Sequence, residues 1–209
     1  MEPNAAHRKV HWALLISGAG VLVWSGIAPV DRFTWLLEVA PAVAGAAVLL
    51  ATARRFRFST LAYTLVWVHA ILLMIGGHWT YAEMPLFNWL RDTLHLARNH
   101  YDRVGHLAQG FIPAILAREI LLRTSPLRRG KWLFAIVLSF CLAFSALYEL
   151  LEWWTSAAVG ESADQFLALQ GDEWDSQWDM LLALIGAVAA QLLLARAHDR
   201  SMAKLAADR

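Results

Sequence analysis

The chain has 209 residues, of which 58% are hydrophobic and 11 are tryptophan, and its mean hydropathy is +0.44. This composition excludes a soluble domain of ordinary makeup and indicates that the chain is solvated by a lipid bilayer. The formal net charge of +1 is the sum of acidic and basic segments that are separated along the sequence. Cys141 is the single cysteine, so the chain forms neither an intramolecular disulfide nor a thiolate metal cluster.

Six apolar windows follow one another along the chain, and each has a length within the roughly 17 to 25 residues that a helix needs to cross a bilayer. We place them at 11–30, 33–53, 59–77, 102–122, 131–155 and 175–196. Between the third and fourth windows, Tyr81 to His100 predicts a loop with a short amphipathic helix around Asn88 to Ala97. The sequence thus predicts an all-α, polytopic membrane bundle of six transmembrane helices, with residues 1–209 forming a single integral membrane domain.

The basic residues of the predicted connections give the orientation of this bundle. If the N-terminus is cytoplasmic, the inner connections hold most of the Lys and Arg, including Arg54 and Arg55. The last outer connection, 154–175, then contains neither Lys nor Arg. Because cytoplasmic loops are enriched in basic residues, we expect both termini to be cytoplasmic, with the connection 157–171 outside.

Ionisable residues gather at the outer ends of three predicted helices. The fourth helix begins YDRVGHLAQGF, which places Asp102, His106 and Gln109 on one helical face. The fifth helix ends SALYELLEWW and the sixth begins GDEWDSQWDM, so carboxylates recur about one turn apart on each. The predicted topology brings these three helix ends to the same side of the membrane.

Carboxylates and imidazoles from several helices are the groups with which bundles build a divalent metal site or a proton-transfer pair. The candidate catalytic residues are Asp102, His106, Glu149, Glu152 and Asp179. The candidate metal ligands are Asp102, His106, Glu149, Asp175, Asp179 and His78, a mixture of oxygen and imidazole groups that suits Zn, Mn or Fe. In the alternative interpretation, Asp172, Glu173 and Asp175 complement a helix dipole and Asp102 caps the fourth helix.

Polar and small residues elsewhere have simpler structural interpretations. His69 lies within an apolar segment, which predicts buried packing with a hydrogen bond for the imidazole. Arg118 and Glu119, at the inner end of the fourth helix, are interpreted as anchors at the cytoplasmic boundary rather than as a second site. Small residues of the sixth helix, such as Ala183 and Gly186, predict close packing against another helix.

The chain resembles the YjdF-like family of bacterial inner-membrane proteins, an uncharacterised family in terms of biochemical function. The stretches that carry this resemblance are GGHWTYAEMPL, NHYDRVGHLAQGFIPAILAREILLR, ALYELLEWW and GESADQFLALQGDEWDSQWDMLLALIGA. The resemblance implies a multi-pass protein of the bacterial inner (cytoplasmic) membrane, and it implies no particular reaction.

The chain is also, more distantly, similar to VanZ-like membrane proteins, some of which are associated with resistance to a glycopeptide antibiotic. The matching positions are Asp102, Arg103, His106, Glu149, Glu152, Asp179 and Gly186. VanZ-like chains tend to have Gln and Asn where this chain has Glu152 and Ala183. This likeness therefore implies the architecture and the position of a site more than an activity.

Three classes of function are compatible with these patterns. The first is an enzyme that acts on a lipid or lipid-linked envelope substrate at the outer leaflet, and the second is a non-catalytic membrane scaffold. The third is an ion-coupled transporter, for which Pro41 and Gly110 with Pro113 would break two helices near the midplane. The expected partners are membrane lipids and a lipid-linked substrate, with no nucleic acid.

Overall fold

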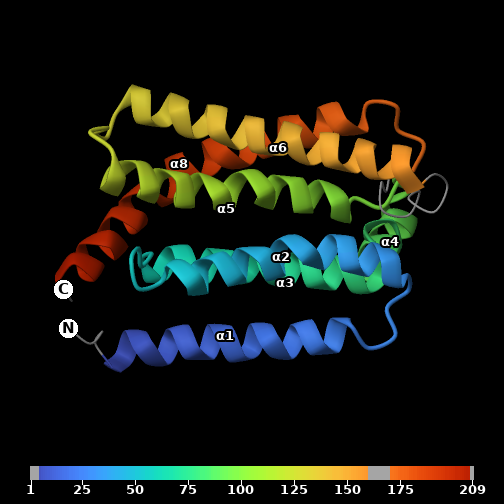
Figure 1. The fold of residues 1–209 in the computed structure, drawn as a ribbon. Helices are drawn as coiled ribbons and strands as arrows, with labels where there is room; N and C mark the ends of the chain where they lie inside the picture. Colours follow the sequence, from blue (N-terminus) through green and yellow to red (C-terminus); the bar gives the residue numbers. More distant parts are fainter. Residues whose placement is uncertain (1–4, 160–169, 208–209) are drawn as a thin grey trace.

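The computed structural model describes residues 5–159 and 170–207, and within these ranges it contains helices and no strand. The elements are α1 (Ala5–Ser25), α2 (Arg32–Thr52), α3 (Thr60–Trp79), η1 (Tyr81–Glu83), α4 (Pro85–Leu94), α5 (Tyr101–Thr124), α6 (Lys131–Val159) and α8 (Asp175–Ala207). The long helices lie roughly side by side, with both chain ends at one end of the bundle and α4 at the other (Figure 1). We call these the terminal end and the α4 end. The all-α prediction is confirmed for the described residues.

Helices α2, α3, α6 and α8 are long and apolar enough to cross a membrane by length and composition. Helices α1 and α5 have comparable lengths and pack within the same bundle, α1 against α3 and α5 against α8. Both carry charged residues, which lowers their mean hydropathy: Arg8 and Lys9 begin α1, and Asp102 and Arg103 begin α5. The described structure is therefore that of a multi-pass membrane protein. Most of the predicted outer connection, 157–171, lies outside the described residues.

Short polar side chains determine where several helices begin. Asp31 caps α2 and Ser59 caps α3, each by accepting a hydrogen bond from a backbone N–H of the first turn. At the start of α5, the side-chain oxygen of Asn99 accepts from the Tyr101 N–H at 3.0 Å. Asn99 therefore provides the side-chain acceptor at the start of α5 that the alternative interpretation expected from Asp102. The Asp102 carboxylate is instead buried in the bundle. That interpretation of Asp102 was wrong.

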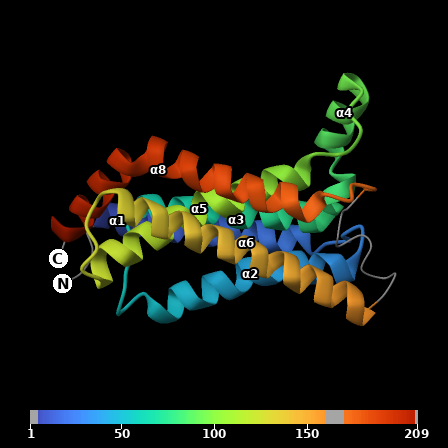
Figure 2. The same cartoon turned by 90° about the horizontal axis from the view of Figure 1, so that it is seen from above.

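The predicted amphipathic helix is present as α4, which starts three residues earlier than expected. Pro85 occupies its first turn, where the missing N–H costs no hydrogen bond. The helix ends at His95, whose left-handed backbone (φ 53°) turns the chain back toward α5. Viewed from above, α4 projects from the bundle (Figure 2). Its side chains Leu86 and Trp89 are exposed.

The largest departure from the predicted boundaries is at the C-terminal helix. The apolar window ends at 196, but α8 continues to Ala207 and has 33 residues. A helix of that length spans about 50 Å, against about 30 Å for the hydrocarbon core of a bilayer. Hydropathy detects the membrane-crossing part of a helix and not a polar extension such as the one that contains Arg200 and Lys204.

Helices α5 and α8 cross so closely that two glycines are required. A Cβ on Gly110 would lie 1.7 Å from the Ala183 carbonyl oxygen, and one on Gly186 would lie 2.1 Å from the Leu107 carbonyl oxygen. The predicted packing role of the small residues on the last helix is confirmed. The crossing sets the start of α5 beside the start of α8. Neither Pro41 nor Pro113 interrupts its helix, so the predicted breaks are not formed.

Candidate functional site

The α4 end of the bundle contains a buried group of ionisable side chains from α5, α6 and α8. His106 lies at its centre, with Nε2 3.3 Å from Asp102 Oδ1 and 3.8 Å from Asp179 Oδ2. Its Nδ1 is 3.8 Å from Glu149 Oε1. We call Asp102, His106, Glu149 and Asp179, together with Arg98, Arg103 and Asp175, the polar cluster. The structure thus brings together the three helix ends that the sequence pointed to.

Gln109 orients the central imidazole. Its side-chain oxygen lies 2.9 Å from His106 Nδ1, so Nδ1 donates a hydrogen bond to it. In the neutral ring this leaves the lone pair on Nε2, which faces Asp102 and Asp179. A hydrogen bond that fixes the second ring nitrogen in this way is the arrangement found behind metal-binding and proton-transferring histidines.

Two arginines bridge the carboxylates of α8. Arg103 donates from Nη1 to Asp179 at 2.9 Å and from Nη2 to both Asp172 and Asp175 at 2.8 Å. Arg98 also donates to Asp175. The sequence analysis named neither arginine as a candidate site residue, although Arg103 is one of the positions that match the VanZ-like pattern. The signal that would have identified them is the surplus of carboxylates nearby, since buried anions require cationic partners.

Some carboxylate oxygens of the polar cluster have no hydrogen-bond donor among the described residues. These buried atoms are Asp102 Oδ2 and Glu149 Oε1. One ligand atom each from Asp102, His106 and Asp179 lies within 4.8 Å of the others. Asp102 Oδ2 lies 3.5 Å from Arg98 Nη2, in an ion pair without hydrogen-bond geometry. Buried polar atoms normally have hydrogen-bond partners, and two carboxylate oxygens without them beside an imidazole form a donor set that fits a divalent cation.

Two further predicted residues lie at the polar cluster or beside it. Asp175 is held between Arg98 and Arg103, as described above. Glu152 follows Glu149 by about one turn on α6, is half-buried, and lies close enough for its charge to act on His106.

His78, the remaining predicted ligand, lies on another face of α3. Its Nδ1 is 3.0 Å from the Ser25 carbonyl oxygen, and its ring contacts Trp24 of α1. Gly76, two residues earlier, is the position that faces Tyr101 of α5. Residues two apart on a helix point in nearly opposite directions, so His78 faces away from α5. We leave His78 out of the proposed site.

An apolar groove of about 610 Å³ leads to the polar cluster between α2, α3, α5 and α6. Its walls include Gly45, Leu73, Ile112, Leu116, Phe140 and Phe144. Tyr81, His106, Gln109 and Tyr148 form the end of the groove at the polar cluster. Along α5 the lining runs from Gly105 to Ile120, a rise of about 22 Å. The groove is therefore continuous with the imidazole at the centre of the cluster.

Two further polar residues lie beside this groove. His69 lines the groove and is half-buried, and no hydrogen bond to its imidazole is found within the described residues, so the predicted hydrogen bond is not formed. Glu38 is 2% exposed and lies beside Tyr81, near enough to Asp102 and His106 for their charges to act on it. The charged and polar surroundings of His106 thus extend to α2.

A second buried network lies at the terminal end, around Glu119. This side chain is fully buried and accepts hydrogen bonds from the Ser59 N–H at 2.8 Å and the Ser59 hydroxyl at 2.7 Å. His198 Nε2 lies 2.9 Å from Glu119 Oε2, and Arg123 Nη1 donates a hydrogen bond to Glu119 Oε1 at 2.5 Å. The interpretation of Glu119 as a boundary anchor was wrong. It joins α3, α5 and α8 in a network whose carboxylate oxygens are both hydrogen-bonded.

Comparison with known proteins identifies the family of this chain. Residues 10–200 match the family described as predicted membrane proteins, DUF2238. The chain belongs to this family. It is 47% identical over 182 residues to the inner membrane protein YjdF of Escherichia coli (strain K12), which covers 87% of each chain. The YjdF-like resemblance is confirmed, and this DUF2238 protein is a multi-pass inner-membrane protein. No solved structure matches the chain, and the VanZ-like resemblance stays a prediction.

Proposed function

We propose that this DUF2238 protein is an enzyme that acts on a lipid or lipid-linked substrate of the cell envelope, with the polar cluster as its reaction site. The observation that carries the proposal is the apolar groove that ends at His106. An apolar tail in this groove would place its polar headgroup against the carboxylates and the imidazole. Ligand sites in proteins are typically apolar clefts with a few convergent polar groups, as in this arrangement.

In this proposal the chain crosses the membrane six times, with both termini in the cytoplasm. The comparable lengths of α1 and α5 and their packing within the bundle support six crossings. Exposed arginines at the terminal end, including Arg54, Arg128 and Arg200, support a cytoplasmic location for that end. The polar cluster then opens toward the outer leaflet, where headgroups of envelope lipids lie.

The charge of the polar cluster favours a cation as part of the site. Its carboxylates outnumber Arg98 and Arg103, so a bare anionic headgroup would be repelled. Asp102, His106 and Asp179 would hold a divalent ion, which as a Lewis acid would polarise an ester or phosphoryl oxygen of the substrate. Glu149 and Glu152, on the facing helix α6, are the residues placed to exchange a proton with substrate or water.

A scaffold is the second candidate, because Arg98 and Arg103 connect the start of α5 to the start of α8. A network that serves packing alone has its buried acceptors satisfied, as around Glu119. The polar cluster instead leaves Asp102 Oδ2 and Glu149 Oε1 without a hydrogen-bond donor among the described residues. A transporter has less support, because α2 and α5 are unbroken and the polar residues lie at one end of the bundle.

The test combines metal analysis with turnover of a natural lipid mixture. The purified protein is analysed for Zn, Mn and Fe and then incubated with a total bacterial lipid extract, whose components are followed by mass spectrometry. We expect a stoichiometric metal and consumption of one lipid component. His106→Ala and Asp179→Ala should each abolish both, while the protein still folds. Gly45→Leu, which adds a side chain inside the groove, should reduce consumption and leave the metal content unchanged.

Gly20→Leu is the matched control for the groove. A Cβ at Gly20 or at Gly45 meets no atom within 4 Å, but Gly20 lies on α1 and does not line the groove. This variant should retain full consumption of the lipid. A parent protein without stoichiometric metal, whose His106→Ala and Asp179→Ala variants melt at much lower temperature, would support the scaffold and reject the enzyme.

A further inference from the structure

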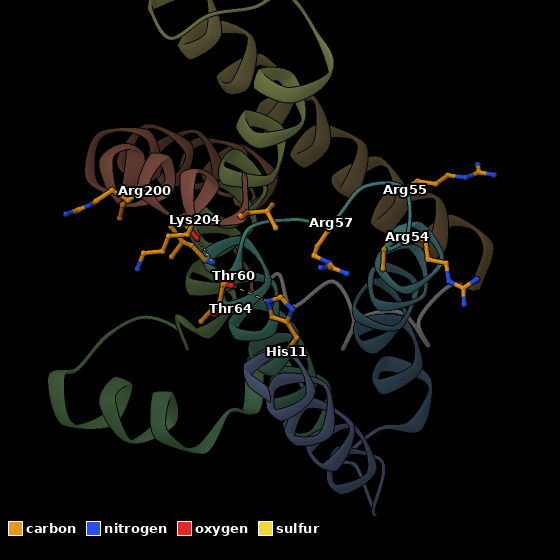
Figure 3. Close-up of a pocket in the computed structure, with 13 residues that line it drawn as sticks. His11, Arg54, Arg55, Arg57, Thr60, Thr64, Arg200 and Lys204 are labelled. Carbon is orange, nitrogen blue, oxygen red and sulfur yellow. Dashed lines mark hydrogen bonds between the residues drawn. The ribbon is translucent and has the colours of Figure 1, made fainter. Parts of the chain in front are cut away.

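A second cavity, of about 700 Å³, lies at the terminal end between α1, the α2–α3 connection, the start of α3 and the polar extension of α8. Its basic lining residues are Arg54, Arg55, Arg57, Arg200, Lys204 and His11. Figure 3 shows Arg57 and His11 near its centre, with Arg55 and Arg200 extending outward from the rim. None of the described residues that line the cavity is acidic.

These basic side chains differ from three arginines at the same end of the bundle that have acidic partners. Arg118 and Arg129 pair with Asp199 at 2.8 Å, and Arg123 pairs with Glu119. In contrast, within residues 5–159 and 170–207 no carboxylate pairs with any arginine or lysine of the cavity. Like charges around one cavity repel one another, and an anion in the cavity would relieve this repulsion.

The floor of the cavity is held in place by hydrogen bonds. The Leu61 N–H donates to the Ser201 hydroxyl oxygen at 3.2 Å, which leaves the hydroxyl hydrogen of Ser201 able to donate to a ligand. Thr60 Oγ1 lies 3.3 Å from His11 Nε2 (Figure 3). The first turn of α3 is therefore fixed at the cavity, and the positive end of its helix dipole adds to the attraction for an anion.

The connection between α2 and α3, which carries Arg57, is also held in place by hydrogen bonds to α5. The Arg57 carbonyl oxygen accepts a hydrogen bond from Arg123 at 2.7 Å, and Ser59 is bound twice by Glu119. The backbone on both sides of this connection is thus positioned by the buried network at the terminal end. The side chain of Arg57 can meet a ligand without a cost for ordering its backbone.

From this cavity, from its arginines and lysine, which pair with no carboxylate of the described residues, and from its fixed hydroxyls, we infer that the terminal end contains a binding site for a phosphate group. The site lies between helices at an end of a membrane bundle, where basic pockets bind the headgroups of anionic lipids. A phosphodiester headgroup and a soluble phosphate share the chemistry that Arg57, Lys204 and Ser201 would recognise. This inference does not depend on the proposed reaction at the polar cluster.

The test measures retention of ligand by the full-length protein in detergent. Delipidated protein is mixed with phosphatidylglycerol or phosphatidylcholine, and retained lipid is counted by native mass spectrometry. Inorganic phosphate is tested separately by its effect on the melting temperature. We expect retention of phosphatidylglycerol over phosphatidylcholine, and about a tenfold weaker affinity for phosphatidylglycerol in the double variant Arg57→Gln/Lys204→Gln, because charge-assisted hydrogen bonds are lost.

The matched control is Arg128→Gln/Lys131→Gln, which removes the same two charges from exposed positions of the same end that do not line the cavity. It should retain phosphatidylglycerol like the parent protein. Stabilisation by inorganic phosphate without lipid retention, lost only in the cavity variant, would assign the site to a soluble phosphate compound. The inference would be overturned by equal losses in both double variants. It would also be overturned if the parent retained the two lipids equally and inorganic phosphate did not stabilise it. Unchanged elution and melting of each variant without ligand shows that it is folded.

Discussion

At the scale of single residues, Arg103 shows how the bundle holds acidic side chains in a place with little water. It is 13% exposed and reaches three carboxylates of the α8 segment, all within 2.9 Å. The planar guanidinium has several donors in a fixed fork, so one arginine can serve carboxylates in different directions. A lysine, with one compact charge, would not span the same set. The arginine therefore sets the spacing between the start of α5 and the start of α8.

Removing Arg103 should consequently be costly. In Arg103→Gln, neighbouring carboxylates would be left buried with reduced charge compensation, which destabilises a protein by about 3 kcal/mol or more. We expect a clearly lower melting temperature in detergent. The matched control is Arg91→Gln on α4, where the exposed pair with Asp92 should leave the melting temperature unchanged. Equal melting temperatures for the two variants would contradict the role of Arg103.

The residues of the polar cluster differ in how far sequence predicted them. Helical spacing and hydropathy together predicted that His106, Glu149 and Asp179 lie at one level, because depth in a membrane follows from position within an apolar window. The rotation of a helix about its axis does not follow from hydropathy, and His78 therefore faces α1 instead of α5. Arg98 was missed because it lies before α5, in a connection without helical periodicity. The left-handed backbone of His95 determines the course of this connection and therefore where the Arg98 side chain points.

At the scale of helices, the crossing of α5 and α8 determines the geometry of the site. Small residues predicted a close contact on the last helix, and the structure supplies the partner, α5, with Gly110 opposite Ala183. Sequence could not supply this partner, because a stripe of small residues indicates close approach and not which helix approaches. Sequence likewise could not predict the groove, since it depends on α2 standing apart from α6 (Figure 1).

Substitution of Gly186 tests this crossing. In Gly186→Ala the new methyl group would overlap the Leu107 carbonyl, which forces α5 and α8 apart. Overpacking typically costs about 1–3 kcal/mol, so the melting temperature should fall. The matched control is Gly20→Ala. The Cβ at position 20 meets no atom within 4 Å, so this variant should melt like the parent protein. A Gly186→Ala variant as stable as Gly20→Ala would show that the helices do not cross this closely.

At the scale of the whole molecule, the two ends of the bundle have opposite electrostatic character. The α4 end holds a surplus of carboxylates around His106, whereas the terminal end has a cavity whose arginines and lysine pair with no carboxylate of the described residues. Apolar helices between them keep the two groups apart by most of the thickness of a membrane. An asymmetry of this kind gives a membrane protein a fixed orientation, because basic segments are retained in the cytoplasm during insertion.

The orientation is tested by reporter fusions at described positions of the two ends. Alkaline phosphatase folds only outside the cytoplasm, so a fusion after Leu96, between α4 and α5, should be active. Fusions after Ser125, between α5 and α6, and after Ala207 should be inactive, and green fluorescent protein at the same three positions should give the opposite pattern. The two reporters control for each other, because a fusion that is merely degraded is silent in both.

The reverse pattern would place His106 on the cytoplasmic side and exclude a substrate in the outer leaflet. Activity after both Leu96 and Ser125 would mean that α5 does not cross the membrane, and the six-helix arrangement would then be wrong.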